Sequence, residues 1–381
     1  MRIALFTPFS PEIGGGSAQL RSHLQQMSDL DVDWYYLSQT TEQGERRHRL
    51  GAPLTQTQFL SDLSARTGFL PGSKSAVRDL VNQMPADLYW IVAHKEGVSV
   101  AAELLDLGKK VHLTVHDDPF GTWIRSDRYR FFRPLLSRTF PRILRSAQSI
   151  DVTSWGMRNL YRQKYGVNCF ALYLHVPHLP QSITAPDPSC LTVGHIGTLY
   201  HPEPFRRFLA ACKNAAAKKK RHFRFIRIGT SPEIDSIAAK NPGTFEFHPD
   251  LTEQAAIPLL AQCDFLYAMY PPGKRFELFR KTSLPVKLST YLQAQRPVFA
   301  HTPPDSTLAR IVGPARVGQV CDSIGQDVIE QHINTVLDMP PLRDNFESLR
   351  WQLMGLTQVE QLHAALRGEN WQSFSEFNFP L

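Results

Sequence analysis

The stretch Thr282-Ser-Leu-Pro-Val-Lys-Leu-Ser-Thr-Tyr-Leu-Gln-Ala-Gln-Arg-Pro-Val-Phe-Ala-His301 decides the expected fold of this chain. It predicts a loop, a helix over residues 286–294, a tight turn and a buried strand over residues 297–300. Pro285 suits the first turn of a helix, because its missing N–H is not needed there. A helix followed by a buried strand is typical of a parallel α/β sheet.

The expected helix carries a lysine at its beginning. Three apolar side chains recur at helical spacing and predict one buried face: Leu288, Tyr291 and Leu292. Lys287 then lies at the helix N-terminus, after the hydroxyls of Thr282 and Ser283. The positive end of the helix dipole and a lysine together predict an anion site.

Composition indicates a globular protein with two domains. The chain has 381 residues, 42% hydrophobic and 20% charged, which is enough for two ordinary cores. No apolar run approaches the ~20 residues that cross a bilayer. The first residues predict a strand rather than a signal peptide, and the five cysteines show no CxxC spacing. We therefore expect a cytoplasmic protein without a zinc site or a disulfide framework.

The net charge of +7 is unevenly distributed. Seven arginines lie between Arg125 and Arg145, opposed only by Asp127 and interleaved with aromatic and aliphatic residues. This basic segment predicts a helix over residues 130–146, which could contact anionic lipid at a membrane surface or hold a phosphorylated acceptor. The alternative is a solvated helix whose apolar side is core. Nucleic acid is not expected as a partner, because no binding module accompanies the charge.

Strands and helices alternate along both halves of the chain. The first half predicts strands over residues 2–7, 33–37, 88–93, 110–116 and 149–153, with helices over 17–27, 74–83 and 97–107. A proline-rich linker spans residues 176–188. The second half predicts strands over residues 190–194 or 190–196, 223–228, 245–248 and 265–270, with helices over 204–217, 233–239 and 252–262. A helical stripe follows over residues 343–366. This alternation predicts α/β domains with parallel sheets.

Two loops after expected strands carry polar or glycine-rich sequence. Gly14, Gly15 and Gly16 follow the first strand and precede Ser17, a good N-cap, but they match neither GxGxxG nor GxxxxGK[ST]. His116 and Asp117 end a later strand, at the edge where open α/β sheets bind ligands. His112 shares a strand face with His116, yet no third metal ligand is identifiable. Asp117 is expected to cap the next turn or to orient His116.

These segments together resemble the family 4 glycosyltransferases of the GT-B fold. The resemblance rests on the glycine-rich first loop, the His-Asp strand end, the segment from Thr153 to Gly166 and the closing Arg296-Pro-Val298 turn. It implies two Rossmann-like α/β domains that face one another across a cleft. Residues 1–180 would form the acceptor-side domain and 189–342 the nucleotide-sugar domain. Residues 343–381 would form a C-terminal helix that crosses back to the first domain.

The same resemblance implies roles for individual residues. His116 would contact the transferred sugar and Lys287 would hold the diphosphate, and these two are the expected catalytic residues. Asp117 would lie on the acceptor side or orient His116. Donor-binding residues would be Gly15, Gly16, Gly197, Thr198, Lys281, Thr282, Ser283 and Thr290.

The chain departs from the family pattern at four positions. The usual arginine falls on Thr198 and the usual lysine near Glu203, while the usual Glu-x7-Glu pair falls on Thr282 and Thr290. Nearby cations could replace the clamp on the diphosphate: Lys274, Arg275, Arg280, Lys281 and Lys287. No side chain is identifiable as the general base. The resemblance implies that the donor phosphate itself accepts the acceptor proton.

We therefore predict a glycosyltransferase of the hexosyltransferase type that moves a sugar from a nucleotide-diphosphate donor to an acceptor hydroxyl, with retention. No metal or other cofactor is expected, and the acceptor would be a carbohydrate, a lipid-linked compound or a protein. Two rivals remain: a non-catalytic GT-B binding protein or scaffold, favoured by the missing carboxylates, and a nucleotide-sugar epimerase of related fold. An epimerase would consume the donor without an acceptor.

Overall fold

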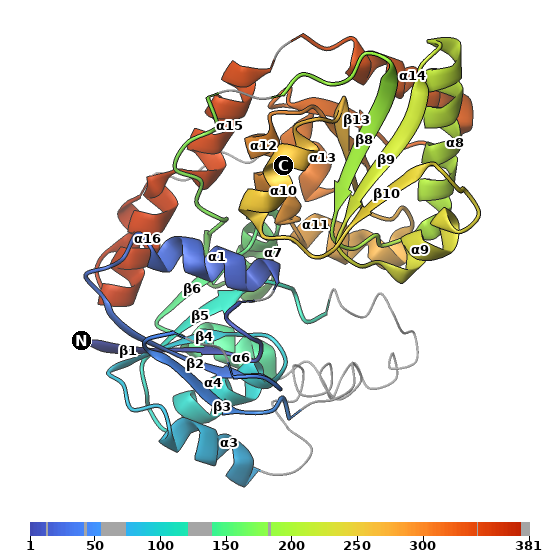
Figure 1. The fold of residues 1–381 in the computed structure, drawn as a ribbon. Helices are drawn as coiled ribbons and strands as arrows, with labels where there is room; N and C mark the ends of the chain where they lie inside the picture. The colour runs from blue at the N-terminus through green and yellow to red at the C-terminus, as the bar shows by residue number, and fades with distance from the viewer. Residues whose placement is uncertain are drawn as a thin grey trace. The chain divides into compact units, whose positions relative to one another are not determined.

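The computed structural model describes residues 1–12, 14–41, 44–54, 74–120, 139–181, 184–340 and 342–374. These residues form two compact α/β units (Figure 1). Unit 1 contains Met1–His175, Lys281–Ser283 and the segment from Gly355 onward, whereas unit 2 contains Val176–Arg280 and Leu284–Met354. The prediction of two α/β domains with parallel sheets is confirmed.

Unit 1 is built on a seven-stranded parallel sheet with the order β3-β2-β1-β4-β5-β6-β7. Its strands are β1 (Arg2–Thr7), β2 (Asp31–Leu37), β3 (Arg47–Gly51), β4 (Leu88–Val92), β5 (Val111–Val115), β6 (Ser149–Val152) and β7 (Phe170–Ala171). Its helices are α1 (Gly15–Leu24), α3 (Lys74–Asn82), α4 (Glu96–Asp106), α6 (Thr139–Ser146), α7 (Trp155–Tyr165) and α16 (Leu356–Arg367), with a final 3₁₀ turn at Trp371–Ser373.

Both faces of the unit 1 sheet are buried, as parallel sheets require. Alternate residues of β1 point to opposite faces: Ile3 belongs to a core with Leu362 of α16, and Ala4 belongs to a core with Leu104 of α4. The same alternation continues along β2 and β4. Helix α16, coloured red in Figure 1, is therefore part of the unit 1 core although it lies at the end of the chain.

Unit 2 contains a six-stranded parallel sheet with the order β10-β9-β8-β11-β12-β13. The strands are β8 (Cys190–Ile196), β9 (His222–Ile228), β10 (Phe245–His248), β11 (Phe265–Met269), β12 (Val298–His301) and β13 (Gly318–Cys321). The helices are α8 (Pro202–Lys218), α9 (Pro232–Ala238), α10 (Glu253–Leu260), α11 (Glu277–Thr282), α12 (Lys287–Ala294), α13 (Thr307–Val312), α14 (Gln326–Leu337) and α15 (Arg343–Met354), with a 3₁₀ turn at Lys274–Phe276.

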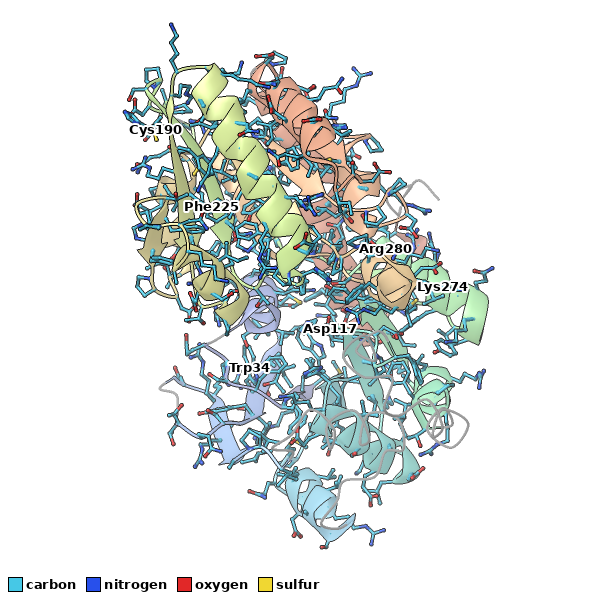
Figure 2. The ribbon with its side chains drawn as sticks, turned by 90° about the vertical axis from the view of Figure 1, so that its right-hand side faces the viewer. Trp34, Asp117, Cys190, Phe225, Lys274 and Arg280 are labelled. Carbon is cyan, nitrogen blue, oxygen red and sulfur yellow. The ribbon has the colours of Figure 1, made fainter. Side chains whose placement is uncertain are left out.

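Aromatic side chains fill one face of the unit 2 sheet beneath α8. The ring of Phe225, labelled in Figure 2, meets Phe205 of α8 edge-on, with ring centroids 5.2 Å apart. Phe208 of α8 lies 4.1 Å from the ring of Tyr267 on β11. Such pairs contribute roughly 0.5–1.5 kcal/mol each beyond the area that they bury. These aromatic contacts fix helix α8 to the unit 2 sheet.

The C-terminal tail forms two helices where the sequence predicts one stripe. Gly355 has extended backbone (φ −77, ψ 177) and separates α15, in unit 2, from α16, in unit 1. A glycine at this position weakens the helix, because it loses more backbone entropy there than alanine would. The apolar stripe is therefore shared between the cores of the two units.

Several elements were not predicted. Helix α7 has clear end signals: Ser154 Oγ accepts a hydrogen bond from the N–H of Met157 at 3.0 Å, and Gly166 adopts a left-handed conformation with φ 65. Strands β3 and β7 and helices α11, α13 and α14 are also additional to the prediction, as is β13. Of the helix expected over residues 130–146, only α6 is described. Most of the basic segment between Arg125 and Arg145 lies outside the described residues.

Candidate functional site

In each unit, the sheet edge formed by the carboxyl ends of the parallel strands is a candidate ligand-binding site. In unit 2 the chain continues from β8 to β9 and β10 on one side and then places β11 on the other side of β8. In unit 1 it does the same around β1, with β4 on the far side. Ligands of open α/β sheets bind outside the carboxyl ends at such switch points. The predicted site residues Gly197 and Gly16 follow β8 and β1, the first strands of these two sheets.

Lys287 begins α12 and reaches the loop after β8. Its Nζ donates to the carbonyl oxygen of Thr198 at 3.2 Å and lies 3.4 Å from His195 Nε2. Loss of water around the half-buried ammonium lowers its pKa from 10.5 to about 7. No carboxylate is bonded to this lysine in the part of the chain that the structure describes. Among the described residues this cation therefore has no counter-ion, and an anion would stabilise it.

His195 supports the lysine from β8. Its Nδ1 lies 2.9 Å from the carbonyl oxygen of Tyr267, which can only accept a hydrogen bond. Burial, followed by the charge of Lys287, lowers the pKa of His195 to about 3, so the ring is neutral near pH 7. Its Nε2 lies 3.1 Å from the carbonyl oxygen of Gly197 and 3.4 Å from Lys287 Nζ, and it presents a lone pair to the lysine in the tautomer in which Nδ1 carries the proton. This neutral ring holds the lysine in place without removing its charge.

The loop after β8 brings backbone close to the lysine. Gly197 has φ +79, and a Cβ added to it would lie 3.9 Å from Lys287 Nζ. Thr198 is exposed next to it. A glycine in this conformation keeps the loop open beside the ammonium, and an L residue there would be strained. Lys287, Gly197 and Thr198, all predicted as site residues, are thus brought together.

Thr290 lies one helical turn further along α12 and is bonded to α10. Its Oγ1 donates to Oε1 of Glu253 at 3.1 Å, and the same oxygen accepts from Ser289 Oγ at 2.9 Å and from Gln293 Nε2 at 3.1 Å. Glu253 therefore places a carboxylate beside the position where the resembled family has its second glutamate. Donor binding by Thr290 itself stays a prediction.

Arg280, one of the five cations that could replace the clamp on the diphosphate, has a structural role. Its guanidinium binds Asp305 through two hydrogen bonds of 2.6 and 2.8 Å and donates to the carbonyl oxygen of Gly273 at 2.7 Å. The residue is only 8% exposed, so these bonds satisfy a buried charge. Lys274 and Arg275 are exposed nearby (Figure 2 labels Lys274 and Arg280). Lys287 is the cation among these five that lies at the strand ends.

Three further predicted donor-binding residues, consecutive in the sequence, belong to unit 1. Lys281, Thr282 and Ser283 are grouped there by their contacts. The carbonyl oxygen of Thr282 accepts a hydrogen bond from Ser154 Oγ, at the start of α7. Thr282 and Ser283 are both buried. Their role toward a donor stays a prediction.

His116 lies at the end of β5 against the glycine-rich loop. A Cβ added to Gly16 would come within 2.6 Å of His116 Nδ1, so only glycine fits this approach. The ring stacks on Phe9, with centroids 6.3 Å apart and an interplanar angle of 28°. Burial lowers the pKa of His116, which keeps the ring neutral. Its Nε2 is buried and has no hydrogen-bond partner among the described residues, so a ligand hydroxyl could supply one.

The turn after His116 is capped by a different aspartate from the one expected. Asp118 Oδ1 accepts from the N–H of Phe120 at 2.8 Å, and its Oδ2 accepts from the hydroxyl of Tyr161 at 2.9 Å. Asp117, labelled in Figure 2, is exposed instead. Capping by Asp117 was therefore wrong, whereas its orienting role stays a prediction. Gly15 is exposed at the start of α1.

The described residues contain neither a metal cluster nor a membrane span. No three His, Cys, Asp or Glu side chains in these ranges gather as ligands would. His112 instead bonds to Ser149 at 2.7 Å and to Asp151 at 2.9 Å within the unit 1 core. Over the same ranges, every helix is too short or too polar to cross a bilayer.

Known proteins match this chain in structure but not in sequence. No family model and no curated protein matches it. Sucrose-phosphate synthase (tll1590) from Thermosynechococcus elongatus aligns with a TM-score of 0.67 at 13% identity, over 96% of this chain and 98% of that one. WaaG, a glycosyltransferase involved in lipopolysaccharide biosynthesis, gives 0.60 at 12% identity, over 96% and 100%. An alpha-glucosyltransferase in complex with UDP gives 0.57 at 12%, over 96% and 99%.

These likenesses define the class of fold. The chain has the GT-B fold of the glycosyltransferases that it resembles, as its sequence predicts. At 10–14% identity the likeness establishes the fold alone. The chemistry of this chain must therefore be argued from its own side chains.

Proposed function

We propose that this protein is a glycosyltransferase that moves a sugar from a nucleotide-diphosphate donor to an acceptor hydroxyl. The observation that carries the proposal is the Lys287 ammonium, held at the strand ends of unit 2 by a carbonyl oxygen and a neutral histidine, without a carboxylate partner in the described residues. A departing diphosphate gains negative charge, and a preorganised cation stabilises that charge most. The GT-B fold supports the same class of reaction.

Lys287 suits a charge that develops during the reaction. In the free protein its pKa is about 7, so roughly half of the molecules carry the ammonium at neutral pH. A diphosphate bound beside it would raise the pKa, because an opposite charge favours the protonated form. Binding of the donor would thus take up a proton and complete the site.

Unit 1 has polar groups at its own strand ends. The unpartnered Nε2 of His116 suits a sugar hydroxyl, and Gly16 allows backbone to approach a ligand beside it. We propose that the sugar is transferred with retention and that no metal takes part. The site then acts by positioning and by stabilising the diphosphate, with the donor phosphate accepting the acceptor proton. A carbohydrate, lipid-linked or protein acceptor, a cytoplasmic location and peripheral membrane contact complete the proposal.

The non-catalytic alternative has one supporting observation. Thr290 stands where the resembled family has a carboxylate, and its hydroxyl is occupied by Glu253. Lys287 argues against a scaffold, because it is a desolvated lysine without a counter-ion among the described residues. Such a charge reduces stability unless a ligand compensates it.

Thermal-shift measurements with UDP, GDP and ADP and with their glucose conjugates test the proposal. We expect one nucleotide at about 100 times its Kd to stabilise the protein by roughly 2.7 kcal/mol. A scaffold would show no nucleotide-dependent shift. Product analysis with the donor alone and with an acceptor pool then separates the enzymes: an epimerase converts the donor alone, whereas a transferase gives a glycosylated acceptor.

The affinity for the nucleotide diphosphate is expected to fall as the pH rises above 7. The unbound lysine, with a pKa of about 7, loses its proton over this range, and binding requires the protonated form. Each pH unit above the pKa of Lys287 should weaken binding by at most tenfold. Over the two units from pH 7 to pH 9 we therefore expect the affinity to decrease by about tenfold or more.

Isothermal titration calorimetry in buffers of different ionisation enthalpy measures this proton uptake directly. Lys287→Arg serves as the control, because a guanidinium stays protonated throughout the range. Equal affinity of the unaltered protein at pH 7 and pH 9 would show that Lys287 does not titrate on binding.

A further inference from the structure

Lys95 lies on an unusually sharp turn between a strand and a helix of unit 1. The chain leaves β4, passes through Ala93-His94-Lys95 and enters α4 at Glu96. Lys95 has φ 46 and ψ −122, a conformation that side chains other than glycine seldom adopt. By comparison, Gln295 (φ 51, ψ 41) lies in the ordinary left-handed region. The backbone of Lys95 is therefore more strained than that of Gln295.

The residues around Lys95 fit this turn closely. A Cβ added to Gly97 would lie 1.9 Å from the carbonyl oxygen of Val92, so a glycine is required two residues after the lysine. Ala93, two residues before it, is small and buried. A strand–turn–helix with small residues on both sides of a strained residue is the geometry that exposes the nucleophile of α/β-hydrolases above a sheet. Here it presents a lysine.

Glycine would fit the conformation at position 95 with less strain, and a lysine is found there instead. Lys95 is half-buried; its carbonyl oxygen accepts a hydrogen bond from the N–H of Val98 at 3.3 Å, but its ammonium makes no hydrogen bond or ion pair with any residue that the structure describes. Its neighbour Glu96 is fully buried, so the lysine is the charged group left at the surface of the turn. Backbone hydrogen bonds hold the turn, but no contact of the lysine side chain compensates the strain, which points to a function of that side chain.

The position of this turn indicates what the side chain meets. Lys95 follows β4 and Phe9 follows β1, on the two sides of the switch point of the unit 1 sheet. The Phe9 ring lies 6.5 Å from the His94 ring and 6.3 Å from the His116 ring. His116 adds a buried nitrogen without a partner among the described residues. A cation and a polar atom without a partner among the described residues thus share the edge at which open α/β sheets bind ligands.

We propose that Lys95 recognises an anionic group, a phosphate or a carboxylate, on the acceptor of the reaction. The identification of the ligand as the acceptor rests on the proposed glycosyltransferase function. The anion site itself is argued from the geometry of unit 1 alone. The ammonium supplies a point charge to the anion, at the same sheet edge where His116 is proposed to contact the transferred sugar. The acceptor would thus be an anionic sugar or sugar-like compound rather than a neutral one.

Saturation-transfer and titration NMR with glucose 6-phosphate, glucuronic acid, glucose and inorganic phosphate test this assignment. We expect one of the two anionic sugars to bind at least about tenfold more tightly than glucose, a difference of about 1.4 kcal/mol. A preference for the phosphate or for the carboxylate distinguishes the two sources of charge. Inorganic phosphate should compete with the preferred sugar.

Lys95→Gly is the decisive variant, because glycine adopts the observed backbone without strain. We expect it to lose the preference for anionic sugars while its Tm rises by about 2–4 °C. Lys95→Arg should keep the preference. Lys109→Gly, which removes an exposed lysine after α4, should also keep it.

Three outcomes would overturn the assignment: equal binding of anionic and neutral sugars, an unchanged preference in Lys95→Gly, or no binding of either anionic sugar at about 10 mM, where a millimolar site would be occupied. Lys287→Ala separates this test from that of the donor site. If nucleotides give no thermal shift but anionic sugars still bind through Lys95, the donor proposal fails and the unit 1 site stands.

Discussion

Replacing Lys287 by alanine is expected to lower kcat/KM by about 10²–10³-fold, the usual effect of removing one donor from a preorganised anion site. The ammonium would stabilise the diphosphate more as charge develops on it, so the loss should appear in kcat as well as in KM. The folded state should tolerate the change. The lowered pKa means that the protonated lysine is disfavoured in the free protein, so removing it takes no favourable ion pair away.

Two variants control this measurement. Lys287→Met keeps much of the side-chain volume and removes only the charge, so it should lose activity to the same extent. Lys240→Ala removes an exposed lysine after α9 of the same unit and should leave kcat/KM unchanged. If Lys287→Ala retained full turnover with an unchanged Tm, the lysine would lie outside the reaction.

Replacing Asp151 by alanine is expected to reduce the free energy of unfolding of unit 1 by about 3 kcal/mol. Asp151 is fully buried on β6, and its Oδ2 accepts from His112 Nε2 at 2.9 Å and from the hydroxyl of Thr114. Each buried donor left without a partner costs about 1–3 kcal/mol. Trp90 Nε1, which donates to Thr114 at 2.7 Å, extends this network to β4.

Chemical denaturation followed by tryptophan fluorescence measures this loss. Asp106→Ala removes an exposed aspartate that pairs with Arg142 and should change stability by less than about 1 kcal/mol. Asp151→Asn, which keeps an acceptor oxygen, should fall between the two. Equal stability of Asp151→Ala and Asp106→Ala would mean that the His112 network does not hold the strands of unit 1 together.

Much of the fold could be predicted because its signals are local in sequence. The strands Arg2–Thr7 and Phe245–His248 occur with the expected bounds, since the first contains a short apolar run and the second alternates phenylalanine with polar residues. The start of α12 followed from Pro285 and from the spacing of Leu288, Tyr291 and Leu292. The position of Lys287 at the start of this helix was therefore predicted, whereas the anion site in unit 2 stays a prediction.

The partners of the site residues could not be predicted, because they are far apart in sequence. Lys287 meets His195 from 92 residues away, and Thr290 meets Glu253 from 37 residues away. His195 lies within a strand pattern, where the sequence indicates only a core position. For the same reason the sequence could not show that Arg280, one of five cations that could replace the clamp, is bonded to Asp305 from 25 residues away.

The backbone of Lys95 was also missed. A positive φ is expected at glycine, and a lysine gives no signal of it. Gly97 after a strand was the available indication, because a glycine at the start of a helix often allows close approach to a preceding strand. Asp118 rather than Asp117 caps the turn after β5. The sequence could not show which of these two adjacent aspartates points toward the backbone N–H.

The most direct measurement is a crystal structure with the nucleotide diphosphate that gives the largest thermal shift. We expect a phosphate oxygen within about 3 Å of Lys287 Nζ, beside the backbone of Gly197 and Thr198, which is hydrogen-bonding distance for an ammonium. A nucleotide bound elsewhere, with Lys287 still bonded only to Thr198 and His195, would contradict the proposed donor site.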